Sequence, residues 1–208
     1  MRISREAKER TRERILEAGR TLFVGRGFDA TTTRELAAGA GIAAGTLFNY
    51  FESKEALAVA LVADALSAAR DDFRARRTGD EQIAEALFLH VATGIRRLEP
   101  YRGFVGAVLE TALSPFALSG VARVGDELRA EHLEVVEELL DTCGGAPRSF
   151  VTLHLYWTLY LGAMAFWTGD TSPNQEDTLS VLDESLRVFT LALTHPTTTE
   201  LDDGQPNR

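Results

Sequence analysis

The stretch Gly27–Lys54, which reads GFDATTTRELAAGAGIAAGTLFNYFESK, decides how the rest of the chain is interpreted. Thr32 is followed three residues later by Glu35, the spacing of a capping box, so we expect a helix to begin directly after Thr32. Gly41 supplies the left-handed residue that a tight turn requires, and it ends this helix after about two turns. A second short helix is predicted over residues 44–50. Two short helices about a glycine turn form a helix-turn-helix, whose second helix enters the major groove of DNA.

The predicted second helix carries small and polar side chains that suit a DNA surface. Gly45 lets the backbone approach a phosphate, Thr46 and Asn49 can bond base edges or phosphate, and Tyr50 offers a hydroxyl to a phosphate. Ser53 is expected to cap the next helix. Lys54 lies in the first turn of that helix, where free amides and a cation can hold one more phosphate. Each residue alone is more often an ordinary polar surface position. Together with the capping box and the glycine turn, they predict a DNA interface.

Composition and charge exclude several other classes of protein. The chain has 208 residues, 45% of them hydrophobic and 25% charged, as in an ordinary globular protein. Residues 1–57 hold ten Lys or Arg and eight Asp or Glu, a net charge of +2, whereas residues 58–208 hold twelve and twenty-three, a net charge of −11. An acidic body with a less acidic head can still present a positive field in one place. The basic start can equally be a solvated helix end.

Nothing in the sequence predicts secretion or a membrane span. The first residues are charged throughout, without the apolar core of a signal peptide. The longest nearly apolar stretch, Leu153–Trp167, is 15 residues long and contains His154, short of the roughly 20 that a spanning helix needs. Cys143 is the single cysteine and cannot form an intramolecular disulfide. We therefore expect a cytoplasmic protein.

Apolar spacing of three and four residues predicts an all-α fold, with no strand alternation. Nine helices are expected, at about residues 5–25, 33–40, 44–50, 54–76, 81–98, 101–114, 119–141, 148–168 and 175–194. We expect three parts: a helix-turn-helix domain over 1–57, a helical-bundle domain for ligand binding and dimerisation over 58–195, and a disordered tail over 196–208. The tail has one large apolar residue, Leu201, which is too little to form a core.

The helix at 148–168 is apolar nearly all round, so it must be buried on two sides. Phe150, Trp157, Leu161 and Met164 form one side, and the other is formed by Val151, Leu155, Leu159, Gly162 and Phe166. We expect one side to face the core and the other a second copy of the chain. The helix at 175–194 is its expected companion in a homodimer interface.

The sequence of residues 10–60 resembles the tetracycline-repressor (TetR/AcrR) family of bacterial transcription regulators. The matching residues are Ala18, Phe23, Gly27, Phe28, Thr31, Thr32, Arg34 to Ala37, Ala40 to Ile42, Gly45 to Leu47, Tyr50, Phe51 and Ser53 to Leu57. The resemblance implies a three-helix DNA-binding domain, an all-helical regulatory domain and a homodimer that binds a palindromic operator. It also implies that Thr33, Arg34, Thr46, Tyr50 and Lys54 touch DNA, with Gly45 and Asn49 at the groove; the expected interface is Thr32, Thr33, Arg34, Ala44, Gly45, Thr46, Asn49, Tyr50 and Lys54.

Three positions depart from the family's usual pattern. Ala43 replaces a Ser or Thr that would cap the second helix, Ala44 replaces a frequent Lys or Arg, and Phe48 replaces a frequent Tyr. A missing cap costs ~0.5–2 kcal/mol. We therefore expect weaker phosphate contacts than in strongly basic relatives.

The body offers candidates for a ligand cavity but no recognisable catalytic set. His90, His132 and His154 fall at or beside apolar stripes, and we favour hydrogen-bonded core histidines over ligand contacts. No metal-ligand spacing, nucleophile elbow, P-loop or dinucleotide fingerprint occurs, so we expect no metal, no cofactor and no enzyme. Bulky aromatic residues with interspersed glycines can instead leave a cavity for a hydrophobic small molecule. The candidate contacts are Phe88, Phe104, Glu110, Phe116, His132, Trp157 and Tyr160; a solid core without ligand is the alternative.

The predicted function is a ligand-responsive DNA-binding regulator, a repressor released from its operator by the ligand. Two other classes of protein stay open at this point. A helical enzyme that keeps the head for docking would need convergent titratable residues in its pocket. An architectural DNA binder would be basic over a long surface, whereas residues 58–208 carry a net charge of −11.

Overall fold

The computed structural model describes residues 5–109, 121–144 and 149–194, and these residues form helices and no strand. The predicted all-α class is confirmed. The elements are α1 (Arg5–Arg26), α2 (Thr33–Gly39), α3 (Ala44–Leu47), α4 (Lys54–Arg76), α5 (Ile83–Leu98), a 3-10 turn (Glu99–Tyr101), α6 (Arg102–Val108), α7 (Val121–Leu139), a π-helical turn (Leu140–Gly144), α8 (Phe150–Gly169), a 3-10 turn (Pro173–Gln175) and α9 (Glu176–Thr194).

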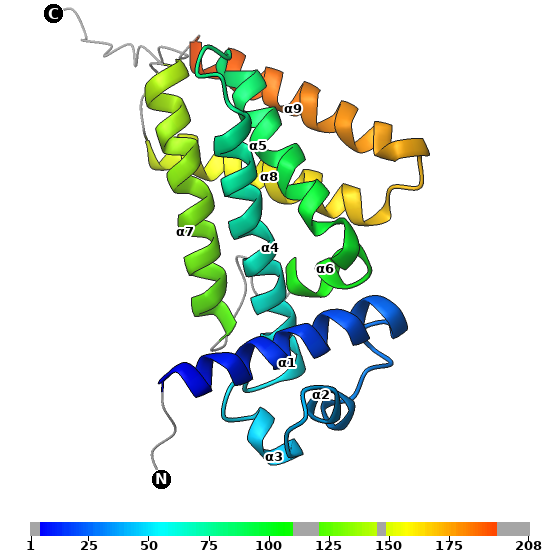
Figure 1. Ribbon diagram of the computed structural model, residues 1–208. Helices are drawn as coiled ribbons and strands as arrows, with labels where there is room; N and C mark the ends of the chain where they lie inside the picture. The colour runs from blue at the N-terminus through cyan, green and yellow to red at the C-terminus, as the bar shows by residue number, and fades with distance from the viewer. Residues whose placement is uncertain (1–4, 110–120, 145–148, 195–208) are drawn as a thin grey trace, which may run out of the picture.

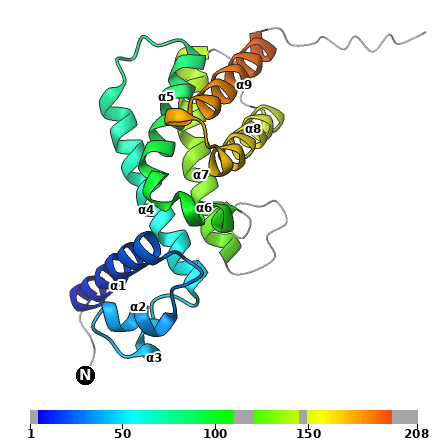
Figure 2. The same ribbon diagram turned by 90° about the vertical axis from the view of Figure 1, so that its right-hand side faces the viewer.

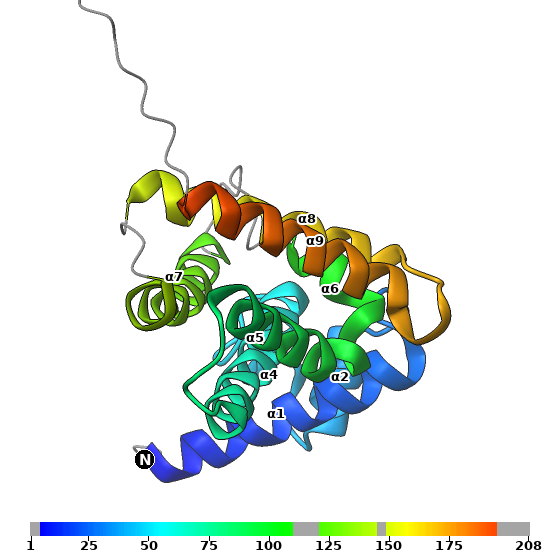
Figure 3. The ribbon, with the colours of Figure 1, turned by 90° about the horizontal axis from the view of Figure 1, so that it is seen from above.

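The helices form a small head and a larger body. Helices α1, α2 and α3 gather at one end, and α4 runs from this head along the length of the body beside α5 and α7 (Figure 1). Helices α8 and α9 lie side by side on the outer side of the body, away from α4 (Figures 2 and 3). One side of the body is therefore formed by the pair of helices α8 and α9, and α4 lies on the opposite side.

The head is joined to α4 by close packing. A Cβ atom at Gly19 of α1 would lie 3.0 Å from Cδ2 of Leu57, so a larger residue would push the two helices apart. Leu57 and Leu61 of α4 are fully buried and belong to the same apolar core as Ile15 and Leu36. The start of α4 is thus part of the head, and its later turns are part of the body.

Most predicted helices are found, with differences at their ends. The predicted helix at 44–50 is regular only over Ala44–Leu47, because Asn49 N and Tyr50 N donate to carbonyls three residues back, at 3.1 and 2.9 Å. Helix α5 begins at Ile83 rather than at 81. Glu81 instead accepts bonds from the backbone amides of Thr78 and Gly79, at 2.7 and 3.1 Å, and holds the preceding loop.

The region after the fifth helix differs more from the prediction. A 3-10 turn precedes α6, which begins at Arg102, and residues 110–120 lie outside the described part of the chain. The end of the predicted helix at 101–114 and the start of the one at 119–141 therefore cannot be compared. The predicted disorder of residues 196–208 also falls outside the described residues. Within 5–109, 121–144 and 149–194, no helix combines the length and the apolar character needed to cross a bilayer.

Candidate DNA interface and effector cavity

The start of α2 is held by the predicted capping box. Thr32 Oγ1 accepts from the amide of Glu35 at 3.3 Å, and Glu35 Oε2 accepts from the amide of Thr32 at 2.9 Å. These bonds, with an ion pair of 2.7 Å to Arg26, lower the pKa of Glu35. The helix is therefore anchored at both its own first turn and the end of α1.

The turn between α2 and α3 has the predicted left-handed glycine. Gly41 has φ +65°, and the amide of Ile42 donates to the carbonyl of Ala37 at 3.0 Å. Ala43 then precedes α3 without a side-chain cap, as expected. Leu47 and Phe51 are buried and hold α3 against the head's core, so α3 is oriented by packing rather than by a cap.

The predicted DNA-contacting residues lie together at the end of the molecule formed by α2, α3 and the start of α4 (Figure 1). Five of them are exposed and four are half-buried: Thr32, Arg34, Ala44, Gly45 and Asn49 in the first group, and Thr33, Thr46, Tyr50 and Lys54 in the second. Helix α3 and its flanking residues add no negative charge to this surface, because residues 43–51 contain no Asp or Glu.

Lys54 has contacts that the sequence did not predict. Ser53 caps α4 by accepting from the amide of Ala56 at 3.0 Å, as expected. The Lys54 ammonium, however, donates to the carbonyl of Phe28 at 2.9 Å and lies 4.2 Å from the centre of the Phe28 ring. Lys54 therefore ties the start of α4 to the loop between α1 and α2.

An aromatic cluster connects the head to α6. Phe28 stacks on Phe104 with ring centres 5.8 Å apart, and Phe23 meets both rings edge-on. Tyr101 contacts Phe104 and accepts a bond of 2.9 Å from Arg20 of α1. Phe104, one of the candidate ligand contacts, thus lies at the joint between head and body.

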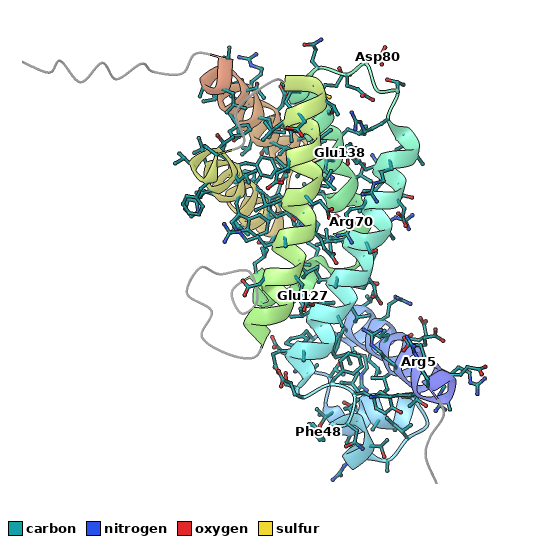
Figure 4. All side chains as sticks on the ribbon, turned by 90° about the vertical axis from the view of Figure 1, so that its left-hand side faces the viewer. Arg5, Phe48, Arg70, Asp80, Glu127 and Glu138 are labelled. Carbon is teal, nitrogen blue, oxygen red and sulfur yellow. The ribbon has the colours of Figure 1, made fainter. Side chains whose placement is uncertain are left out.

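A small cavity lies between α4, α5, α7 and α8. Its volume of about 10 Å³ is enough for about one water molecule. The lining residues are Leu66, Ala69, Arg70, His90, Val91, Gly94, Leu128, His132 and Tyr160. Arg70 reaches from α4 toward α7, where it pairs with Glu131 at 2.8 Å (Figure 4).

The structure brings some of the candidate ligand contacts together and separates others. His132 and Tyr160 line the cavity, and the Trp157 ring lies 5.7 Å from the His132 ring. Phe88 is half-buried on α5 and is not among the lining residues. Glu110 and Phe116 lie outside the described residues.

The three histidines have three different environments. His132 is buried and bonds to the Tyr156 hydroxyl at 2.9 Å, as predicted. His90 is buried, but neither ring nitrogen has a hydrogen-bond partner among the described residues, so that part of the prediction is wrong. His154 is exposed and stacks on Phe150, because its side of α8 faces outward rather than toward the core.

The buried pair of histidines is held neutral. Burial, with the nearby Arg70 and Arg74, lowers the pKa of His90 to about 3. Burial, with His90 and Arg70 nearby, also lowers the pKa of His132. The two rings lie 4.5 Å apart, packed between Phe73 and Tyr160. The cavity therefore offers neutral imidazole groups next to apolar walls.

Helix α8 has two apolar sides, as predicted. Tyr156, Trp157 and Met164 are buried in the body, while Val151, Leu155 and Phe166 are exposed. Phe150 is 78% exposed, whereas Trp157 and Met164, which were predicted to share its side of the helix, are buried. Phe150 is the first residue of α8, two positions before Thr152, the first buried residue of the helix, so its ring extends past the core.

Helix α9 continues the exposed apolar surface. Together the two helices expose eight large apolar side chains, each by 36–78%: Phe150, Val151, Leu155, Phe166, Leu179, Val181, Val188 and Leu191. We call this set the α8–α9 face. An apolar surface of this extent is typical of an interaction site.

Two family models match successive parts of the chain. Residues 15–61 match the bacterial regulatory proteins of the tetR family, and residues 86–205 match the tetracyclin repressor-like C-terminal domain. The second match alone covers more than half of the chain. The chain belongs to the TetR family.

Relatives with curated functions match about a quarter of the chain. The transcriptional repressor KstR2 of Mycolicibacterium smegmatis is 40% identical over 55 residues, 26% of this chain and 27% of that protein. KstR2 of Rhodococcus jostii is 44% identical over 50 residues, 24% of each chain. The alignments thus span about a quarter of these relatives' length.

Solved structures match nearly the whole chain at low identity. Thermus thermophilus FadR, a TetR-family repressor solved with lauroyl-CoA, has a TM-score of 0.70 and 23% identity, with 95% of this chain and all of that chain covered. A TetR regulator from Rhodococcus sp. RHA1 has a TM-score of 0.66 and 21% identity, covering 90% and 99%. The fold, a TetR head on a TetR-type helical body, is shared with both. The family that the chain belongs to is one of bacterial regulatory proteins. No group of three or more metal-ligating side chains occurs in the part of the chain that the structure describes.

Proposed function

We propose that this TetR-family regulator is a cytoplasmic repressor that binds a palindromic operator as a homodimer and is released by a hydrophobic small molecule. The observation that carries the proposal is the α8–α9 face on a chain with one helix-turn-helix. Eight exposed large apolar side chains favour a partner, and a second copy supplies a matching surface through two-fold symmetry. Such a dimer holds two reading heads.

The operator follows from this symmetry. Each head would place α3 in the major groove, so the two half-sites should be spaced by about one helical turn, ~34–36 Å, or a multiple of it. Repression is supported by the two KstR2 relatives, which are named as transcriptional repressors. The net charge of −11 over residues 58–208 favours DNA contact through the head alone.

The effector is proposed to bind at the cavity between α4, α5, α7 and α8. Its lining is mostly apolar, with His132 and Tyr160 as orienting groups. The FadR complex with lauroyl-CoA supports a ligand with a long apolar part. Because the described cavity holds about one water molecule, the ligand-bound arrangement must be a more open one.

Helix α4 provides the path by which opening of the cavity reaches the head. Leu66, Ala69 and Arg70 of α4 line the cavity, and Lys54 at its start holds the Phe28 loop. A ligand that binds the DNA-incompetent arrangement ~100-fold better supplies a coupling of ~2.7 kcal/mol. That coupling empties an operator held with modest affinity.

The dimer and the operator are tested together. Sedimentation at micromolar concentration should show two chains, and a duplex selected from a random library should contain two inverted half-sites. A stable monomer that shifts a short duplex with 1:1 stoichiometry would exclude the proposal.

The effector is tested on that selected duplex with a panel of hydrophobic and anionic polar metabolites. Release by hydrophobic compounds is expected, and Trp157→Ala should reduce this response while DNA affinity changes only a few fold. Phe104→Ala should also reduce the response, although through the joint between head and body rather than at the cavity. Release by polar metabolites alone, unaffected by either substitution, contradicts a hydrophobic effector.

A further inference from the structure

The aromatic residue Phe48 lies on the outward side of α3 and is not among the expected DNA contacts. Phe48, directly after α3, is 52% exposed, and it lies at the head end of the molecule (Figure 4). Ala44, four residues earlier, is also exposed. The surface that the head presents is therefore partly apolar, where the family's frequent Tyr and Lys or Arg would make it polar.

Packing fixes the direction of this ring. Leu47 and Phe51 are only 3% and 7% exposed, so their side of the helix faces the head's core. Phe48 has φ −68° and ψ −12°, which continues the helical path. Residues four apart on a helix share a side, so Phe48 and Ala44 lie together, and their exposure places that side toward solvent.

The groups on either side of α3 suit phosphates. Arg34 in the first turn of α2 is exposed, while Tyr50, three residues after α3, and Lys54, the first residue of α4, are half-buried. Side chains of this kind set the register of a protein on the DNA backbone but carry little sequence information. The short helix between them, with Phe48 and Ala44 outward, is then the element nearest the base edges.

We propose that Phe48 reads the methyl group of a thymine in each half-site, which rests on the proposed function of operator binding. A phenyl ring has no donor or acceptor, so it cannot pair with the hydrogen-bonding edge of any base. The thymine C5-methyl group is the apolar feature of the major groove, and Phe is among the side chains that contact it. Contact removes both the methyl group and the half-exposed ring from water, which favours A·T over the other base pairs at that step.

A sugar or phosphate under the ring is the main competing contact. It would also bury Phe48, but it would not distinguish thymine from a base without the methyl group. Val24 of α1 provides a matched control, because it is 51% exposed on the same head and is not part of α3. Because Val24 and Phe48 are about equally exposed, a loss of binding in the Phe48 variant alone is due to the position of Phe48 beside α3 and not to the loss of exposed apolar surface in general.

The experiment uses the full-length protein and a duplex selected by it from a random library. Each thymine of the selected half-site is replaced in turn by uracil, which removes only the methyl group, in both half-sites at once. Affinities are measured for the unaltered protein, Phe48→Ala, Phe48→Tyr and Val24→Ala, with thermal unfolding of each variant as a folding check.

The expected result is one thymine whose replacement weakens binding of the unaltered protein by about fourfold per half-site, the worth of one buried methyl group. Phe48→Ala should bind thymine and uracil duplexes equally, whereas Phe48→Tyr and Val24→Ala should keep the discrimination. The proposal is overturned if no thymine is sensitive, or if Phe48→Ala retains full discrimination. Failure to select any specific duplex would instead overturn operator binding itself.

Discussion

In the head, the starts of helices are held by hydrogen bonds between sequence neighbours, whereas the interior of the body is built from contacts between side chains far apart in the sequence. Thr32 and Glu35 cap α2, and Ser53 caps α4, each within three residues. The body instead buries His90 without a hydrogen-bond partner among the described residues and leaves the α8–α9 face uncovered. The head is therefore specified locally, while the body keeps an exposed apolar face that the proposed dimer would cover.

The largest effect is expected from a charge on the α8–α9 face. Val151→Asp puts a carboxylate into the proposed interface in both copies, and burial of an unpaired charge is costly. The dissociation constant of the dimer should rise by about 100-fold or more, as measured by sedimentation. Val24→Asp, a change at an exposed valine of the head, should leave the dimer intact. Dimers of equal strength in both variants would show that the face has another role.

Acidification should weaken the body before it weakens the head. The pKa of His90 is lowered to about 3, so below pH 6.5 the unfolded chain binds a proton that the folded chain does not. Stability is therefore fully present above pH 6.5 and falls as the pH drops toward 3, by about 2 kcal/mol at pH 5 for a histidine shifted this far. His132 adds a loss of the same sign.

Urea unfolding between pH 5 and pH 7.5, at one protein concentration, measures this loss. His90→Phe keeps an aromatic ring of similar size and should reduce the pH dependence. The carboxylates of Glu81 and Asp170 also have lowered pKa values, but theirs lie below this range and their protonation contributes only at lower pH. A wild-type stability that stays constant down to pH 5 would contradict the neutral, buried state of both histidines.

Loss of the capping box should have a smaller effect, centred on the head. Thr32→Ala removes the acceptor for the Glu35 amide and should lower the free energy of unfolding by ~1 kcal/mol. DNA affinity should fall as well, because α2 positions α3. Thr158→Ala, which removes an exposed hydroxyl bonded within α8, is the control and should be nearly neutral. Equal destabilisation by the two substitutions would mean that the cap contributes nothing specific to the head.

The smallest expected effect concerns Lys54. If its ammonium moves from the Phe28 carbonyl to a phosphate when DNA binds, Lys54→Ala should reduce the slope of log affinity against log salt by ~0.9 per half-site. Arg96→Ala on the exposed side of α5 removes an equal charge from the body and should leave the slope unchanged. An unchanged slope for Lys54→Ala would place Lys54 in the structure of the head alone.

The sequence by itself determined the elements whose cause is local. The capping box at Thr32, the left-handed Gly41, the cap at Ser53 and the uncapped Ala43 all depend on residues within four positions, and the structure has each of them. The two apolar sides of α8 were also predictable, since helical spacing alone separates them. Most helices of the body could be located in the same way.

Only the tertiary structure decided how distant side chains meet. Lys54 contacts Phe28, and Phe104 joins the head instead of the cavity. The His90 ring contacts the His132 ring of another helix. Helical periodicity predicts which side of a helix is apolar, but not which neighbour that side meets or where the core ends. The exposure of Phe150 was therefore not predicted, and Phe48 was not among the expected DNA contacts. Their exposure depends on the rotation and length of a helix relative to the core, and packing between distant segments sets both.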